Sequence, residues 1–161
     1  ILLAKIHNVA SSMGKGIEPL LCYSEGHHLR AFVRVTTQND VSLKWISPKM
    51  EVVDEEVEGA AGPLWTEKII QKKMIPEDCE GVLGRFFDIL RGEADGPPGL
   101  YDINDMAKEA GIGQTPRRVK IVKALQGLEY FASSSVFSPL GIKTTAPKKK
   151  RNEALELAQS L

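Results

Sequence analysis

Residues 103–130 of the chain, INDMAKEAGIGQTPRRVKIVKALQGLEY, decide its fold. The stretch opens with apolar residues at helical spacing, which predict a short helix: Ile103, Met106, Ala107 and Ala110. Gly111-Ile112-Gly113 predicts a turn, and Thr115 before Pro116 is typical of an N-cap followed by proline at the first helical position. A second helix is then expected, with an apolar side formed by Val122, Leu125 and Leu128. This order, with strand-like residues 130–137 behind it, indicates a winged helix-turn-helix.

Further helices are expected on both sides of this region. From Glu77 to the Gly/Pro stretch 96–99, apolar residues again share one helical face: Val82, Leu83, Phe86, Phe87 and Leu90. After the strand-like residues, positions 152–161 predict one more short helix, with Leu155 and Leu157 on its apolar side.

The first part of the chain combines a helix with strands. Residues 1–13 carry a helical apolar stripe that Gly14 and Gly16 end: Leu2, Ile6, Val9 and Met13. Residues 19–24 and 28–37 are rich in apolar and β-branched side chains, and Glu25-Gly26 predicts the tight connection of a hairpin. Residues 41–46 alternate apolar and polar and predict a third strand.

These patterns predict an α+β fold, in which a small antiparallel sheet packs with helices and a winged-helix-like helical subdomain follows. We expect three parts. Residues 1–75 hold the amino-terminal helix and the sheet, residues 76–136 the winged-helix-like subdomain, and residues 137–161 a closing strand, a basic run and the terminal helix.

Length and composition exclude several protein classes. With 161 residues and 42% hydrophobic content, the chain can bury one core or two small ones. It has no apolar run long enough for a membrane helix and no secretion signal, and its two cysteines suit a reducing compartment. We therefore expect a cytoplasmic protein without a membrane partner, or a nuclear one in a eukaryote, since PKKKR (147–151) resembles an import signal.

Because a helix begins at Ile1, we also expect the chain to start inside a larger protein.

The charges are distributed unevenly, although the net charge is zero. Residues 113–151 contain nine basic residues against the single acid Glu129, whereas five acids and no base lie within residues 51–58. Such a basic segment is typical either of a solvated helix face or of a phosphate-binding surface. The candidate RNA-binding residues are Arg30, Arg117, Arg118, Lys120, Lys123, Lys143, Lys148 and Lys149.

The residues do not indicate catalysis or a metal centre. Gly14-Lys15-Gly16 and Gly111-Ile112-Gly113 each follow an expected helix rather than a strand, which favours helix ends over a cofactor-binding turn. His27 and His28 are adjacent on a strand and would point to opposite faces, so a shared metal ion is not expected. Cys79 lies between two acids, which disfavours a reactive thiolate.

Three stretches, in order, resemble the tRNA guanosine-26 N2-dimethyltransferase family, mainly its archaeal members. IEPLLCYS (17–24) with HHLRAFVR (27–34) is similar to the family's I-x-P-L-L-S-x-S and D-H-Y-x-R-x-F-V. GPLW (62–65) matches its G-P-L-W, and FSPLGIKTTAP (137–147) resembles F-x-x-x-G-[IF]-[KR]-T-[DN]-A-P.

The resemblance implies a carboxy-terminal domain that docks tRNA for a separate catalytic domain. That domain, expected before residue 1, would bind S-adenosylmethionine and carry an acidic D-P-x-G loop, so no cofactor is expected in this chain and its own enzymatic activity is left open. The chain also departs from the family. SPKM (47–50) stands where many relatives have a C-x-x-C knuckle, and SSVF (134–137) stands for R-T-H-F. The alternative is a winged-helix protein-interaction module with no role in RNA binding.

Overall fold

The computed structural model describes residues 1–38, 40–49 and 51–160, and divides the chain into two compact units. Unit 1 contains residues 1–22 and 29–74, and unit 2 contains residues 23–28 and 75–161. The fold class is α+β, as predicted, with helices and small antiparallel sheets. Met50 of the expected knuckle position and Leu161 of the expected terminal helix lie outside the described residues.

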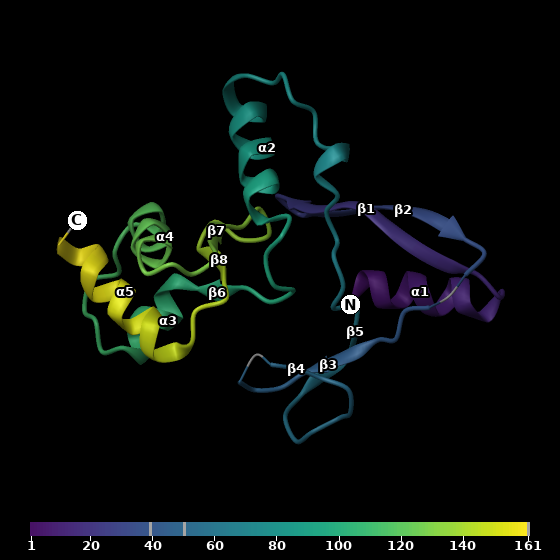
Figure 1. Cartoon of the computed structure of the whole chain (residues 1–161), viewed down its shortest axis with the longest axis horizontal. Coiled ribbons are helices and arrows are strands. Elements are labelled where there is room, and N and C mark those ends of the chain that lie inside the picture. The colour runs from purple at the N-terminus through teal and green to yellow at the C-terminus, as the bar shows by residue number, and fades with distance from the viewer. Residues whose placement is uncertain (39, 50, 161) are drawn as a thin grey trace. The chain divides into compact units, whose positions relative to one another are not determined.

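Unit 1 combines one helix with two small sheets (Figure 1). Helix α1 spans Leu2–Ser12, and strands β1 (Gly16–Glu25) and β2 (His28–Thr36) form a two-stranded sheet whose tip, residues 23–28, belongs to unit 2. In the second sheet β3 (Lys44–Ile46) lies between β4 (Val52–Val53) and β5 (Ala61–Leu64), and the 3-10 helix η1 covers Lys72–Met74. The third strand was thus predicted correctly but is shorter than expected.

Helix α1 buries a different face from the one predicted. Leu3, Ala4 and His7 are buried, whereas Val9 and Met13 are 64% and 72% exposed. His7 packs edge-on against the buried Trp65, with 5.7 Å between the ring centroids. The predicted stripe was wrong because an aromatic contact on the side of His7 sets the rotation of the helix, and that contact is not visible in apolar periodicity.

The residues of the GPLW stretch have structural positions in unit 1. A Cβ at Gly62 would lie 2.6 Å from the Trp45 ring, so only glycine allows the chain to pass so close to that ring. Trp65, three residues later, is buried. Within this motif, Trp65 belongs to the core of unit 1, and Gly62 lets the chain pass the Trp45 ring.

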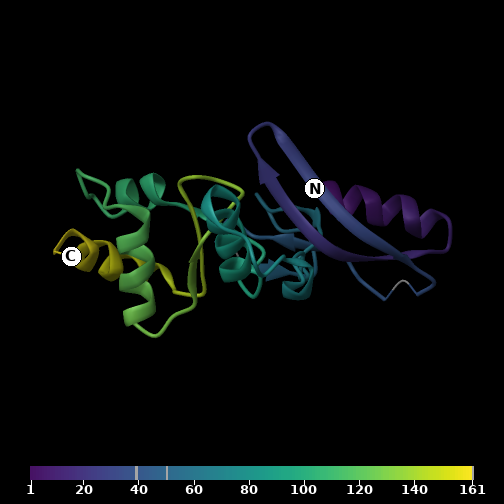
Figure 2. The same cartoon turned by 90° about the horizontal axis from the view of Figure 1, so that it is seen from above.

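Unit 2 arranges five of its elements around one apolar core. Helix α2 (Gly81–Glu93) is followed by β6 (Tyr101–Asp102), α3 (Ile103–Glu109), α4 (Arg118–Gly127), β7 (Ala132–Ser134), β8 (Gly141–Thr144) and α5 (Lys148–Ser160). The antiparallel sheet has the order β6-β8-β7. Helices α4 and α5 lie side by side, as both views show (Figures 1 and 2). Their shared core contains Ile103, Ile121, Leu125, Ile142 and Leu155.

The predicted order of elements in this region is confirmed, with three local corrections. Helix α4 is capped by Arg117 rather than Thr115, and α5 starts at Lys148, so the basic run forms its first turn. Val82 and Leu83 of α2 are 76% and 61% exposed instead of buried. Residues 137–161 contain β8 and α5, which belong to unit 2, and the division of the chain into three parts stays a prediction. The assignment of this order to a winged helix stays a prediction.

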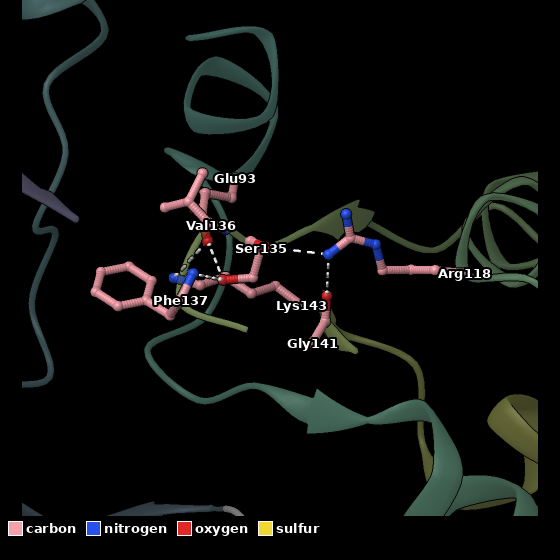
Figure 3. Close-up of polar contacts among 7 residues, drawn as sticks. All are labelled: Glu93, Arg118, Ser135, Val136, Phe137, Gly141 and Lys143. Carbon is pink, nitrogen blue, oxygen red and sulfur yellow. Dashed lines mark hydrogen bonds and ion pairs between the residues drawn. The ribbon is translucent and has the colours of Figure 1, made fainter. Parts of the chain in front are cut away.

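A buried carboxylate connects α2 with the strands of unit 2 (Figure 3). Glu93, the last residue of α2, is 1% exposed, and its carboxylate accepts hydrogen bonds from Ser135 Oγ at 2.7 Å and from the Val136 amide at 2.9 Å. The ammonium of Lys143 on β8, itself 3% exposed, lies 3.8 Å from the same carboxylate. Three elements therefore meet at one carboxylate.

Burial shifts the titration of both members of this pair. Desolvation raises the pKa of the Glu93 carboxyl, against the hydrogen bonds from Val136 and Ser135 and the charge of Lys143. Desolvation also lowers the pKa of Lys143, against the attraction of Glu93. Each charge is therefore tolerated in the interior because the other one is present.

The turn after α4 places a side chain in the left-handed region. Glu129 has φ of 64°, and its amide donates to the Gln126 carbonyl while the Tyr130 amide donates to the Leu125 carbonyl. These two bonds form a Schellman motif, whose left-handed position is usually glycine. The turn directs the chain into Tyr130, Phe131 and strand β7, although Glu129 carries backbone strain there.

Replacing Lys143 by methionine is expected to lower the free energy of unfolding by roughly 3–5 kcal/mol, because it leaves Glu93 buried without a charge partner. The double variant Glu93→Gln/Lys143→Met should recover most of this loss. The Lys143 charge holds the pKa of Glu93 down, so the Lys143→Met variant raises this pKa above its already raised wild-type value. The penalty is fully present where Glu93 is ionised in both folded proteins, and it decreases as pH falls and Glu93 of that variant takes up a proton first. Urea unfolding at pH 7.5 and pH 5 measures this. A penalty that is the same at both pH values would contradict the role of Glu93.

Replacing Glu129 by glycine is expected to raise the free energy of unfolding by about 0.5–1 kcal/mol, since relief of strain exceeds the added freedom of the unfolded chain. Glu129→Ala is the matched control, because it removes the same charge but keeps the Cβ. Thermal unfolding of the two variants separates the effects, and equal stabilisation by both would assign the gain to charge instead of backbone.

Candidate nucleic-acid interface

Two packed helices of unit 2, α4 and α5, begin with basic residues, and we call them the basic helices. Arg117 occupies the N-cap position of α4 without a capping hydrogen bond from its side chain, and Lys120 and Lys123 lie further along the helix. The first turn of α5 contains Lys148, Lys149 and Lys150. Neither helix has an acid in its first turn. Because the amino end of a helix already carries partial positive charge, these side chains raise the positive potential there and favour an anion.

Several of these charges have no internal partner. Within the described residues Arg117, Lys120, Lys123 and Lys149 form no ion pair, and all but the half-buried Lys120 are exposed. They are therefore free to contact a phosphate without first breaking an ion pair.

The other lysines of the first turn of α5 have exposed acidic neighbours. Lys148 Nζ lies 2.8 Å from Glu109 Oε2, and this hydrogen bond and charge lower the pKa of Glu109. Lys150 Nζ lies 2.7 Å from Glu153 Oε2, which raises the pKa of Lys150. The Lys148–Glu109 pair is exposed and the Lys150–Glu153 pair is half-buried, so water and salt weaken the first pair more than the second. A phosphate can replace the exposed carboxylate of Glu109.

The side chain of Arg118 points toward Ser135 and Gly141 (Figure 3). Its Nη1 donates to the carbonyl oxygens of Ser138 at 3.0 Å and Ser135 at 3.2 Å, with Gly141 at 3.5 Å. Partial burial lowers the pKa of the guanidinium, against the attraction of Glu93. Arg118 therefore connects the start of α4 to the loop between β7 and β8 through Nη1.

Lys143 and Arg30 also lie apart from the basic helices. Lys143 is buried beside Glu93, so its ammonium is not presented at the surface, and the sequence-based expectation of a phosphate contact does not fit this placement. Arg30 is exposed on β2 in unit 1. Of the eight predicted residues, six lie on the basic helices, and Arg118 among them is hydrogen-bonded to the β7–β8 loop. The other five are Arg117, Lys120, Lys123, Lys148 and Lys149.

Sequence reasoning missed Glu93 and Arg151. Glu93 follows Phe86 and Leu90 at helical spacing, and a carboxylate on an apolar stripe is the signal that could have predicted a buried partner. Arg151 donates to the Ala146 carbonyl at 2.9 Å, and its guanidinium lies 4.0 Å from the centroid of the Tyr101 ring. This arginine fixes the first turn of α5 to β6 and is not available as a free charge.

The described residues do not assemble a metal site. No group of three His, Cys, Asp or Glu side chains lies close enough together to hold an ion among them. Cys22 is buried in unit 1, and burial raises the pKa of its thiol to about 11. In the part of the chain that the structure describes, no helix combines the length and apolar character needed to cross a membrane.

Comparison with curated proteins finds relatives of one kind. The chain is 28% identical over 91% of its length to the tRNA (guanine(26)-N(2))-dimethyltransferase of Pyrococcus furiosus, and covers 45% of that protein. It is 28% identical over 99% of its length to the enzyme of the same name from Methanobrevibacter smithii, and covers 50% of it. The chain therefore spans about half the length of the curated relatives it matches.

A solved structure has the same fold. The structure of Trm1 from Pyrococcus horikoshii in complex with S-adenosyl-L-methionine superposes with a TM-score of 0.80, covering 96% of this chain and 47% of the other, at 24% identity. The family model of N2,N2-dimethylguanosine tRNA methyltransferase matches residues 44–156, more than half of the chain. The resemblance predicted from the three sequence stretches is thus confirmed, and the chain belongs to the N2,N2-dimethylguanosine tRNA methyltransferase family.

Proposed function

We propose that this chain is the tRNA-binding, carboxy-terminal part of an S-adenosylmethionine-dependent tRNA guanosine-26 N2-dimethyltransferase. Family membership supports the parentage. The observation that supports the binding role is the set of basic side chains on the basic helices that form no ion pair: Arg117, Lys120, Lys123 and Lys149. The partners are tRNA and a catalytic domain that corresponds to the other half of the relatives' length.

The described residues do not fit a site for S-adenosylmethionine. Such a site needs a glycine turn that follows a strand, and the two candidate turns, at Gly14 and Gly111, follow helices α1 and α3. We therefore assign the methyl donor to the catalytic domain and derive no chemical step from this chain.

The role of the basic helices is to hold the RNA backbone. Contacts to phosphate fix the register and orientation of a nucleic acid without reading its sequence. An enzyme that modifies a base must take that base out of its stack, which requires a firm hold on the surrounding backbone. Lysines and arginines at helix starts suit this task because the helix dipole and the side chains attract the same anion.

The alternative is a protein-interaction module without an RNA role, and exposed apolar side chains favour it. Val9 and Met13 of α1 are largely exposed, and Leu157 of α5 is 43% exposed. Under this alternative the basic residues only solvate α4 and α5.

Reversing two charges of α4 distinguishes the two functions. The variant Lys120→Glu/Lys123→Glu is expected to weaken tRNA binding at least 10-fold at low salt, and to reduce the slope of log affinity against log salt by about 1.5–2. The matched control is Lys5→Glu/Lys15→Glu, which changes the net charge equally at exposed positions of unit 1. Fluorescence anisotropy with labelled tRNA at several salt concentrations measures both quantities.

Two results would contradict the proposed RNA role. One is absence of tRNA binding by the wild-type chain at low salt. The other is equal weakening by the α4 variant and its control, because the effect would then come from net charge and not from the basic helices.

A further inference from the structure

We propose that a groove of unit 2, bounded by α2, α4 and β7, holds one unstacked nucleobase of the RNA. This inference rests on the proposed RNA-binding function. It adds a nucleobase-binding site to the surface that contacts phosphates. The groove has a volume of about 460 Å³, which lies within the range of roughly 300–1,000 Å³ typical of small-ligand sites.

The walls of the groove are mainly apolar and aromatic. Ile89 comes from α2, Val122 from α4, and Tyr130 and Phe131 from the segment that leads into β7. The Schellman turn at Glu129 brings the two aromatic residues back beside α4. RNA-binding proteins stack unpaired bases on such aromatic side chains, and every base has a face that can be stacked.

Polar groups in the groove suit the edge of a base. Gln126 Nε2 donates to the Ala132 carbonyl at 2.9 Å, which fixes the amide and leaves its oxygen as an acceptor. Ser134, half-buried on β7, adds a hydroxyl that can donate or accept. An acceptor and a hydroxyl beside an apolar wall match a planar ligand that carries amino and carbonyl groups on its rim.

Lysine side chains lie next to the groove on the same helix. Val122 and Gln126 are four residues apart and form one stripe of α4, and Lys123, three residues before Gln126, is its neighbour on the helix surface. Lys120 lies one turn before Lys123 and, by helical spacing, on the side of α4 away from Val122. Asp88 of α2 also lines the groove, and its carboxylate is paired with Arg91 at 3.0 Å. Lys123 is therefore the cation nearest in sequence to the groove-lining residues of α4, and its charge favours a nucleotide over an uncharged apolar ligand.

A peptide strand added to β7 fits the structure less well. Strand β7 is at the edge of its sheet, but the Ala132 carbonyl already accepts from Gln126, so a peptide would have to displace that side chain. The basic residues of α4 would also not favour the binding of an uncharged peptide.

Gly92 provides a test that leaves every charge and hydrogen bond in place. It lies on α2 at the rim of the groove, and a Cβ there would meet only Ser133 Cβ at 3.9 Å, an ordinary contact. Gly92→Leu therefore places a side chain over the groove. Gly92→Ala is the matched control, because it adds helix propensity but leaves most of the space open.

The probes are a single-stranded RNA decamer and a blunt RNA duplex, titrated by anisotropy into the full chain. Gly92→Leu is expected to weaken binding of the single strand about 10-fold, the effect of losing one stacked base, with the salt slope and duplex affinity unchanged. Gly92→Ala should stay within about twofold of wild type. Circular dichroism checks that both variants are folded.

A second measurement uses the wild-type chain and does not depend on any variant. A decamer with one 2-aminopurine should lose fluorescence on binding as that base stacks on Tyr130 or Phe131, and the Lys120→Glu/Lys123→Glu variant should shift the titration without removing the change at saturation.

The two proposals fail in different ways. If the single strand binds Gly92→Leu as tightly as wild type, or if 2-aminopurine does not respond at saturation, the base site is overturned while salt-dependent binding stands. If the wild-type chain binds neither RNA at low salt, the RNA-binding function itself fails, and the base site with it.

Discussion

The buried pair of Glu93 and Lys143 is the constraint on which the rest of unit 2 depends. Two charges removed from water tolerate burial only when each has the other and when the remaining oxygens are hydrogen-bonded, and the Glu93 carboxylate meets this condition through Ser135 and Val136. Glu93 is the last residue of α2, Ser135 and Val136 follow β7, and Lys143 lies on β8. Because the geometry must hold all of them at once, the end of α2 has one permitted position against the sheet.

This constraint changes the meaning of the FSPLGIKTTAP stretch. Its lysine is the partner of Glu93, the Thr144 hydroxyl donates to the Phe131 carbonyl at 2.6 Å, and the Gly141 carbonyl lies near Arg118. Lys143, predicted from the sequence to contact RNA, and its neighbours in this stretch thus form internal contacts of the β7–β8 hairpin. The charges available for the proposed RNA contact are those at the starts of α4 and α5.

The sequence predicted the elements of the fold well, because α3, α4 and the first hairpin depend on local spacing and turn residues. It failed where a contact distant in sequence decides the outcome. Val82 and Leu83 share a helical stripe with Leu90, but only the end of α2 reaches the sheet, so the first turn stays exposed. In the sequence, Lys143 is one of several basic residues in a basic segment, and its ion-pair partner Glu93 lies fifty residues earlier in the chain. Spacing within one helix cannot reveal a pair of this kind.

The basic residues at the starts of α4 and α5 destabilise these helices, and nothing within the described residues compensates for Arg117, Lys120 and Lys149. A basic residue near the amino end of a helix opposes the dipole, and Arg117, Lys120 and Lys149 have no carboxylate beside them to offset it. In the same unit Asp102 caps α3 through bonds to the amides of Asn104 and Asp105, so the chain uses an acid where only stability matters. A bound phosphate would offset the charge of Arg117 and Lys120 at the start of α4 and of Lys149 at the start of α5, where no carboxylate does so. This difference from α3 supports the proposal that these two helix starts bind an anionic ligand.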